Sequence, residues 1–295
     1  MEIIRDPRHM QQRVTALRRQ GTEIGFVPTM GFLHEGHLAL FRAARRKNPI
    51  LAASIFVNPI QFDRQADLET YPVDLEGDLV KAESAGVDLV FVPEHKSMYP
   101  HGFATGVEVE GLTRRWEGEY RPGHFRGVAT VVTKLFLIVK PHRAYFGQKD
   151  YQQARVVQRL VRDLDMDVAI VVLPTVREPD GLALSSRNVH LTPEERRQAP
   201  ILYQALCWAS DQARAGEQNA QALLTGMRQM IQEKTSATIE YVALCAPDTL
   251  EPIEKIGGPA VLLLAARFAQ VRLIDNHVID IHEEGGDRAS DHVDF

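Results

Sequence analysis

The sequence has few cysteines and no long apolar run, and both absences restrict the class of protein. Cys207 and Cys245 are the only cysteines among 295 residues, too few for a disulfide-rich scaffold, so a reducing compartment is expected. The longest apolar stretches reach about ten residues, half of what a bilayer-spanning helix needs. The first residues contain no apolar core segment, so we expect no signal peptide. These features predict a soluble, cytoplasmic protein with no membrane partner.

Positive charge is not in excess either. Lys and Arg number 34 against 39 Asp and Glu, which gives a formal net charge of −5. A broad basic surface for nucleic acid is therefore not expected, although a local basic pocket for phosphate is compatible with this charge. Hydrophobic residues make up 44% and charged residues 25%, as in globular proteins, and the length favours two domains.

The first 176 residues alternate buried strands with helices. Apolar runs bounded by Gly, Pro or Asn predict strands at residues 23–30, 50–57, 87–93, 143–146 and 167–173. The intervening segments predict helices at residues 36–47, 75–85, 129–139 and 151–164. This alternation is typical of parallel β-α-β units, so we expect an α/β protein with a Rossmann-like, doubly wound parallel sheet. Ligands should then bind at the carboxyl ends of the strands.

The pattern changes after about residue 176. A capping box at Thr192–Glu195 predicts a helix to about residue 215, and a second helix is expected at 219–234. Short apolar strands are expected at residues 239–245, 260–266 and 271–281. This order predicts a smaller α+β domain over residues 177–282, following a first domain over 1–176. The polar end, 283–295, is expected to be disordered.

The loop at residues 28–37, PTMGFLHEGH, follows a predicted strand and opens a predicted helix. Helix N-termini attract phosphate through free backbone N–H groups and the helix dipole. The glycine spacing is like that of a P-loop, but His37 and Leu38 replace its Lys and Ser/Thr. His34 and His37 share one side of a helical turn and can donate hydrogen bonds to phosphate oxygens. Their spacing does not fit a zinc site, and the alternative is a glycine-rich turn with incidental histidines.

Two further strands also end in polar loops. Asn58 and Gln61 carry amides suited to a hydroxyl or carboxylate, unless they belong to a plain Asn-Pro turn. Gly147 permits close approach of a ligand, and Lys149 offers a positive charge to phosphate. Asp150 can alternatively be only the cap of the next helix.

A fourth polar loop, DGLALSSRN at residues 180–188, lies at the junction of the two halves. Its Ser hydroxyls and the Arg187 guanidinium can close over a triphosphate, or the segment can be a polar linker. Three of the four loops follow strands of one predicted sheet, so we expect all four to converge on one crevice.

Five segments together resemble the pantoate–β-alanine ligase family, over about residues 3–282: PTMGFLHEGH (28–37), SIFVNPIQF (54–62), RPGHFRGVATVVTKL (121–135), FGQKDYQQ (146–153) and PDGLALSSRN (179–188). HEGH resembles the HIGH signature of the nucleotidyltransferase superfamily. Gln148 departs from the pattern, because the family most often has Glu there. The resemblance implies an ATP-dependent ligase that forms pantoyl adenylate from (R)-pantoate and then pantothenate from β-alanine, releasing pyrophosphate and AMP. It also implies Mg²⁺, without an assigned protein ligand, and a homodimer.

The resemblance further implies roles for individual residues. The catalytic residues would be His37, His34, Lys149 and Arg187. The nucleotide would contact Met30, Gly31, Phe32, Leu33, His34, Glu35, Gly36, His37, Gly147, Gln148, Lys149, Asp150, Val176, Leu184, Ser185, Ser186 and Arg187. The other substrates would contact Gln61, Gln153, Asn58 and Arg126.

Two other functions are consistent with parts of this pattern. An adenylyltransferase of the same superfamily would act on a phosphate-bearing acceptor and need extra basic residues, whereas Gln61 and Gln153 are uncharged. A non-catalytic nucleotide sensor would lack the groups around the phosphates, yet two histidines, Lys149 and Arg187 are present. The ligase is therefore the favoured prediction.

Overall fold

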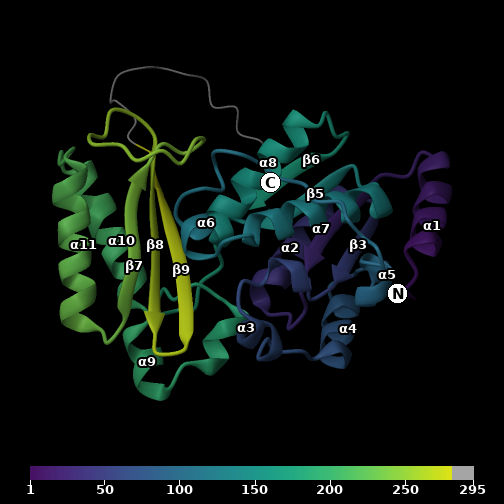
Figure 1. Cartoon of the computed structure of the whole chain (residues 1–295), viewed down its shortest axis with the longest axis horizontal. Helices are drawn as coiled ribbons and strands as arrows, with labels where there is room; N and C mark the ends of the chain where they lie inside the picture. The colour runs from purple at the N-terminus through teal and green to yellow at the C-terminus, as the bar shows by residue number, and fades with distance from the viewer. Residues whose placement is uncertain (281–295) are drawn as a thin grey trace.

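Six parallel strands form the larger of two sheets in the computed structural model, which describes residues 1–280 apart from the side chain of Ala66 (Figure 1). The strands are β1 (Glu2–Ile4), β2 (Ile24–Thr29), β3 (Ile50–Ile55), β4 (Leu89–Phe91), β5 (Arg143–Gly147) and β6 (Ala169–Leu173). Their order is β1-β4-β3-β2-β5-β6, and every pair is parallel. The chain winds from β2 outward through β3 and β4, then returns to place β5 on the other side of β2. The carboxyl ends of β2 and β5 thus flank the switch point, where such sheets bind ligands.

Helices cover both faces of this sheet, as predicted for a doubly wound fold. On one face, α2 (Glu35–Lys47) and α4 (Leu75–Ser84) share an apolar core with Val27 and Val90. On the other, α1 (Pro7–Arg19), α7 (His124–Val139) and α8 (Tyr151–Asp163) pack with Phe26 and Leu89. Successive strand residues point to opposite faces of the sheet, so side chains of one strand pack into the apolar cores on both faces. The connecting elements are η1 (Pro59–Gln61), α3 (Gln65–Glu69), α5 (His95–Met98), α6 (Glu117–Tyr120) and η2 (Gln148–Asp150).

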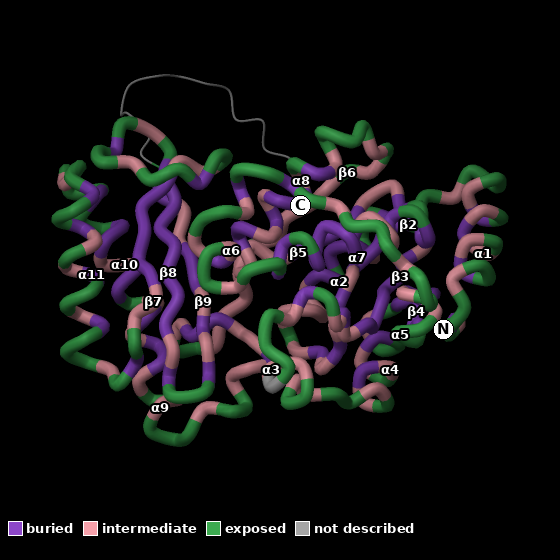
Figure 2. Tube along the Cα trace, in the orientation of Figure 1, coloured by how far each residue is buried: buried purple, intermediate pink, exposed green. Residues whose placement is uncertain are grey.

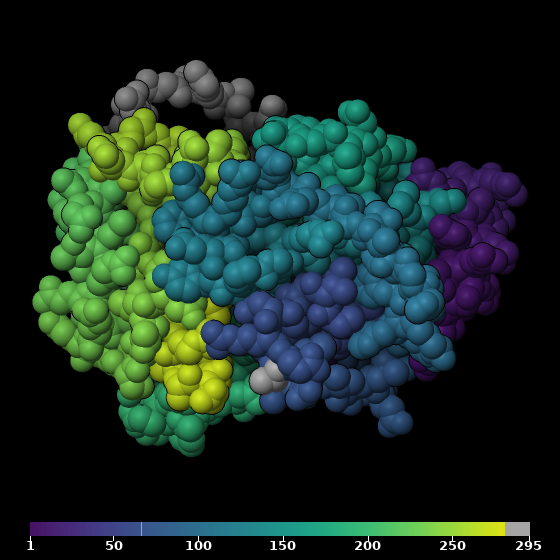
Figure 3. Space-filling model, viewed as in Figure 1, coloured from purple at the N-terminus to yellow at the C-terminus, as the bar shows by residue number. Residues whose placement is uncertain are grey.

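A smaller antiparallel sheet follows, and it is also in line with the predicted α+β end of the chain. It contains β7 (Thr238–Cys245), β8 (Ala260–Phe268) and β9 (Val271–Ile279). One face carries α10 (Ile201–Arg214) and α11 (Ala220–Lys234), preceded by η3 (Ser186–His190) and α9 (Pro193–Gln198). Residues of the other face, among them Tyr241 and Leu263, join the core of the larger sheet. The strands are accordingly buried over most of their length (Figure 2), and the yellow C-terminal surface abuts blue segments of the first half (Figure 3).

The elements differ from the predicted ones in a few places. Neither β1 nor α1 was predicted. A three-residue strand gives a weak periodic signal. Helix α1, by contrast, shows helical spacing in its buried Met10, Val14 and Leu17 and a capping Asp6, so this signal was present and was missed. The long helix expected after Thr192 is broken at Pro200, which cannot donate a backbone hydrogen bond. Helix α7 begins at His124, before the expected start at residue 129. The last strand ends at Ile279, and the predicted tail, 283–295, lies outside the described residues. No helix within residues 1–280 is long and apolar enough to cross a membrane.

Candidate active site

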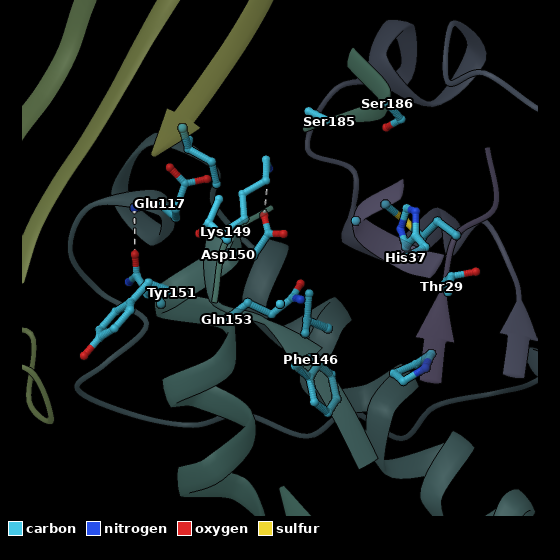
Figure 4. A pocket seen from close by; sticks show the side chains of 18 of the residues that line it. Thr29, His37, Glu117, Phe146, Lys149, Asp150, Tyr151, Gln153, Ser185 and Ser186 are labelled. Atoms are coloured by element: carbon cyan, nitrogen blue, oxygen red, sulfur yellow. Dashed lines mark hydrogen bonds and ion pairs between the residues drawn. The ribbon is translucent and has the colours of Figure 1, made fainter. Parts of the chain in front are cut away.

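A cavity of about 250 Å³ opens at the switch point between β2 and β5. All four predicted loops reach it, as does Gln153 from the first turn of α8. Figure 4 shows Lys149 and Asp150 across the cavity from His37, with Ser185 and Ser186 on the same side of the view as His37. The predicted residues that line it are Met30, His34, Gly36, His37, Asn58, Gln61, Gly147, Lys149, Asp150, Gln153, Val176, Leu184, Ser185, Ser186 and Arg187.

The two histidines lie where β2 passes into α2. His34 caps the helix: its Nδ1 accepts the backbone N–H of Gly36 at 3.2 Å. The backbone N–H of His34 in turn donates to Nδ1 of His37 at 3.3 Å, and the two ring centroids are 4.2 Å apart. Because both Nδ1 atoms accept, each neutral ring carries its proton on Nε2. Each imidazole is therefore an N–H donor at its outer nitrogen.

Burial keeps both rings neutral. It lowers the pKa of His37 to about 3, with a contribution from His34, and the pKa of His34 to about 4, with a contribution from the positive charge of Lys149. Neither ring is an imidazolium at neutral pH. The pair consequently offers two hydrogen-bond donors without adding net charge.

The amides after β3 form a linked pair. Asn58 is buried, and its Nδ2 donates to Gln61 Oε1 at 3.0 Å and to the carbonyl of Gly127 at 3.2 Å. Its Oδ1 accepts from the Tyr99 hydroxyl at 2.7 Å. The hydrogen-bonding capacity of Asn58 is thus largely used within the protein. Gln61, whose Nε2 lies 3.1 Å from Met30 Sδ, is the amide that Asn58 orients.

The loop after β5 carries the cation opposite the histidines. Lys149 Nζ lies 3.4 Å from Asp150 Oδ1, and the lysine side chain is 19% exposed. Burial alone would raise the pKa of Asp150, but Lys149 and Arg187 lower it overall. Asp150 occupies the N-cap position of α8, as the alternative prediction had it, but its carboxylate makes no capping hydrogen bond to the helix N-terminus. Asn276 of β9 donates to the carbonyls of Gln148 and Lys149 at 2.9 and 3.0 Å and fixes this loop.

The segment before η3 closes one side of the cavity. Arg187 pairs with Asp67 at 3.0 Å, and the hydroxyls of Ser186 and Tyr71 lie 3.3 Å apart. The Ser185 side chain accepts the backbone N–H of Arg187 and caps η3. This segment therefore contacts the stretch around α3 as well as the cavity.

The remaining predicted residues do not line the cavity. Glu35 pairs with Arg42 on the exposed side of α2. Arg126 is exposed on the first turn of α7, where its guanidinium packs against Gly106, so the structure does not bring it to the other site residues. The other predicted residues outside the lining belong to the loops that follow β2 and β5: Gly31, Phe32, Leu33 and Gln148. The backbone groups of Phe32, Leu33 and Gln148 make hydrogen bonds that hold these loops in place.

A polar chain that includes two residues of the cavity lining, Arg121 and His124, was missed. Arg121 Nε donates to Asp63 at 3.1 Å, and Arg121 Nη1 lies 3.3 Å from His124 Nε2. His124 Nδ1 lies 2.9 Å from the carbonyl of Gln61 and must donate to it, so the Nδ1–H tautomer is present. Burial, together with Arg121, lowers the pKa of His124 to about 4. The available sequence signal for this polar chain was the presence of Arg121 and His124 in the RPGHFRG segment.

Comparison with known proteins identifies the family of this chain. The family model for pantoate-beta-alanine ligase matches residues 2–278. The pantothenate synthetase of Moorella thermoacetica is 53% identical over 283 residues, covering 96% of this chain and 100% of that protein. The structure of pantothenate synthetase from Thermus thermophilus has a TM-score of 0.90 at 49% identity, covering 95% of this chain and 100% of that one.

A solved complex is also similar. The pantoate–β-alanine ligase of Francisella tularensis, bound to β,γ-ATP and β-alanine, has a TM-score of 0.78 at 36% identity. The alignment covers 94% of this chain and 97% of that one. Since the family model and these relatives span nearly the whole sequence, the chain belongs to the pantoate–β-alanine ligase family.

Proposed function

We propose that this chain carries out the reaction of its family, the ATP-dependent condensation of pantoate with β-alanine, through a pantoyl-adenylate intermediate. The observation that carries the proposal is the convergence of the four loops on one cavity, with two neutral imidazole donors facing Lys149. Such a cavity suits positioning and charge stabilisation rather than attack by a protein nucleophile.

In the first step, a carboxylate oxygen of pantoate bonds to the α-phosphorus of ATP. The bond from that phosphorus to the bridging oxygen breaks, and pyrophosphate leaves with the electron pair. Charge grows on the phosphate oxygens in the transition state, where the Nε2–H groups of His34 and His37 donate hydrogen bonds. Lys149 and Arg187 balance the charge of the phosphates, and Gln61 and Gln153 hold pantoate.

In the second step, the amine of β-alanine bonds to the activated acyl carbon. The bond between that carbon and the phosphate oxygen breaks, AMP leaves with the electron pair, and the amine gives up a proton to solvent. Pantoate and β-alanine must both lie near Gln61, because the amine attacks the carbon that the first step activates. Met30, Gly147, Asp150, Val176 and residues 184–187 would surround the nucleotide.

Magnesium fits this proposal as a partner of the phosphates. Within residues 1–280, no three His, Cys, Asp or Glu side chains are grouped as metal ligands, and nucleotide-bound Mg²⁺ needs few protein ligands. When bound, the ion would neutralise phosphate charge. We assign it no protein ligand.

The wider organisation is proposed on the same basis. Residues 1–176 would form the domain that binds ATP and pantoate, and residues 177–282 the smaller cap. The family resemblance supports a homodimer, which light scattering would detect as twice the chain mass. The need for ATP and the two free cysteines support a cytoplasmic location.

Isotope transfer tests the function. Pantoate labelled with ¹⁸O in its carboxylate is incubated with the enzyme, β-alanine, ATP and Mg²⁺. The proposal predicts pantothenate and AMP, with one ¹⁸O in the AMP phosphate. Label in inorganic phosphate, formation of ADP, or a stable nucleotidyl product would contradict it, and the last would indicate an adenylyltransferase.

A further inference from the structure

The loop that carries both histidines is held by a helix outside the cavity lining. Asp78, in the first turn of α4, accepts the backbone N–H of Phe32 at 2.7 Å and that of Leu33 at 2.6 Å, one on each carboxylate oxygen. Lys81 lies one turn later and donates from Nζ to the carbonyl of Leu33 at 2.9 Å. Neither Asp78 nor Lys81 lines the cavity. Three polar contacts thus attach two consecutive loop residues to α4.

The loop needs such support because its backbone is unusual. Gly31 has φ of +86°, and Phe32 has φ of +49°, a left-handed conformation that residues with a Cβ rarely adopt. A Cβ built on Gly31 would lie 2.9 Å from Asp78 Oδ2, so the carboxylate lies directly against this turn. Leu33 is buried and packs in the cluster that includes Leu79 of α4. Backbone and side-chain contacts therefore fix the same turn.

Both carboxylate oxygens of Asp78 are engaged in holding the loop. Asp78 is 1% exposed, and a carboxylate so deeply buried persists only when its oxygens are paired. Both oxygens are paired with loop N–H groups, and the N-terminus of α4 favours a negative charge there. The two contacts are charge-assisted, which makes them stronger than neutral ones.

The contacts of Asp78 and Lys81 with Leu33 affect the two histidines through the backbone of the loop. Leu33 directly precedes His34, so fixing Leu33 at both its N–H and its carbonyl fixes the peptide that supplies the His34 N–H. That N–H donates to Nδ1 of His37 and selects its Nε2–H tautomer. We propose that Asp78 and Lys81 are positioning residues that hold the turn at residues 31–34, so that His34 and His37 present their Nε2–H groups to the reacting phosphate. The catalytic part of this inference rests on the proposed function.

The first test compares Asp78→Asn with Asp88→Asn. Asn offers only one acceptor oxygen and turns an NH₂ toward the second loop N–H. Asp88 is the matched control, because its Oδ2 also accepts a backbone N–H, that of Leu51 at 2.7 Å, but at the opposite end of the sheet. We expect Asp78→Asn to slow single-turnover adenylation by about 100-fold, the effect of a ~1 Å misplacement, with the KM for ATP little changed. Wild-type rates in folded Asp78→Asn would overturn the inference.

A double-mutant cycle separates positioning from general destabilisation. If Asp78 acts through His37, the Asp78→Asn penalty should shrink to less than about threefold when His37 is already Ala. An equal penalty in both backgrounds would overturn the positioning role. Should Asp78→Asn fail to fold, Lys81→Met should slow adenylation, and Lys81→Gln, which keeps a donor, should restore much of the rate. Equal rates for these two variants would contradict the role of Lys81.

The hydrogen bonds from Phe32 and Leu33 to Asp78, together with that from Lys81 to Leu33, form what we call the clamp. Hydrogen exchange tests this clamp independently of activity. The amides of Phe32 and Leu33 should exchange faster in Asp78→Asn than in the wild type, and at the wild-type rate in Asp88→Asn. Unchanged exchange in Asp78→Asn would overturn the clamp even in an active enzyme. An inactive wild-type protein whose loop amides are protected by Asp78 would instead refute the proposed function and leave the clamp standing.

Discussion

The backbone N–H of His34 donates to Nδ1 of His37 at 3.3 Å, and this contact ties the chemistry of one imidazole to the backbone position of the other. A peptide N–H can donate only to an unprotonated ring nitrogen, so His37 must be neutral with its proton on Nε2. Burial favours the same state by lowering its pKa to about 3. The donor at the phosphate is therefore a neutral imidazole.

The tautomers of both histidines can be observed directly. We expect ¹⁵N spectra of histidine-labelled protein to show His34 and His37 neutral, with protonated Nε2, between about pH 5.5 and 8, where an ordinary histidine titrates. Spectra of His34→Ala and His37→Ala assign the signals. Protonation of either ring near pH 6.5, or a proton on Nδ1, would contradict the assignment.

The same pKa values predict how stability changes with pH. An unfolded histidine takes up a proton near pH 6.5, whereas the folded rings do so only near their lowered pKa values, about 4 and 3. Stability from these two groups is thus complete above about pH 6.5 and is lost progressively as pH falls toward those values. The free energy of unfolding can be measured in urea at pH 7.5 and at pH 5.5. Its decrease between these two pH values should be smaller for the double variant His34→Ala/His37→Ala than for the wild type. An equal loss would refute the shifts.

His37→Ala should greatly slow adenylation. Removing one transition-state donor typically costs about 2.7–4 kcal/mol, a decrease of roughly 100- to 1000-fold in rate. His101→Ala is the control, because that histidine is exposed and outside the cavity. Wild-type turnover in a folded His37→Ala enzyme, measured as pyrophosphate release, would reject the role.

Lys149→Ala should both weaken ATP binding and slow adenylation. Lys149 lies across the cavity from His37 (Figure 4), where its ammonium would meet the phosphates. Lys96→Ala removes a lysine that is 85% exposed and serves as the control. Nucleotide affinity from calorimetry and the single-turnover rate should both fall in Lys149→Ala alone. If neither changes, Lys149 does not contact the nucleotide.

Gln153→Ala should chiefly raise the KM for pantoate. Gln153 reaches the cavity from the first turn of α8, whereas Gln158 on the same helix does not line it and pairs with Arg155. Gln158→Ala is therefore the matched control. A pantoate KM that stays at its wild-type value in Gln153→Ala, or an equal rise in the KM for ATP, would argue against a pantoate contact.

The sequence was sufficient for features that depend on local pattern. Alternating apolar runs predicted the central strands β2, β3 and β5, and the polar residues at their ends predicted the loops that meet in the cavity. Partners far along the chain could not be found this way. Asp78 lies 45 residues from Leu33, and Asn276 lies 128 residues from the Gln148 carbonyl that it binds. Arg126 shows the converse, since its motif suggested a site residue but α7 turns it toward Gly106.

Formation of the intermediate without β-alanine tests the central claim most directly. Enzyme in excess is mixed with pantoate, ATP and Mg²⁺, quenched in acid, and examined by mass spectrometry. The account predicts one equivalent of pantoyl adenylate per active site, together with one equivalent of pyrophosphate, followed by conversion to pantothenate when β-alanine is added. Pyrophosphate release that requires β-alanine, with no adenylate detected, would contradict it.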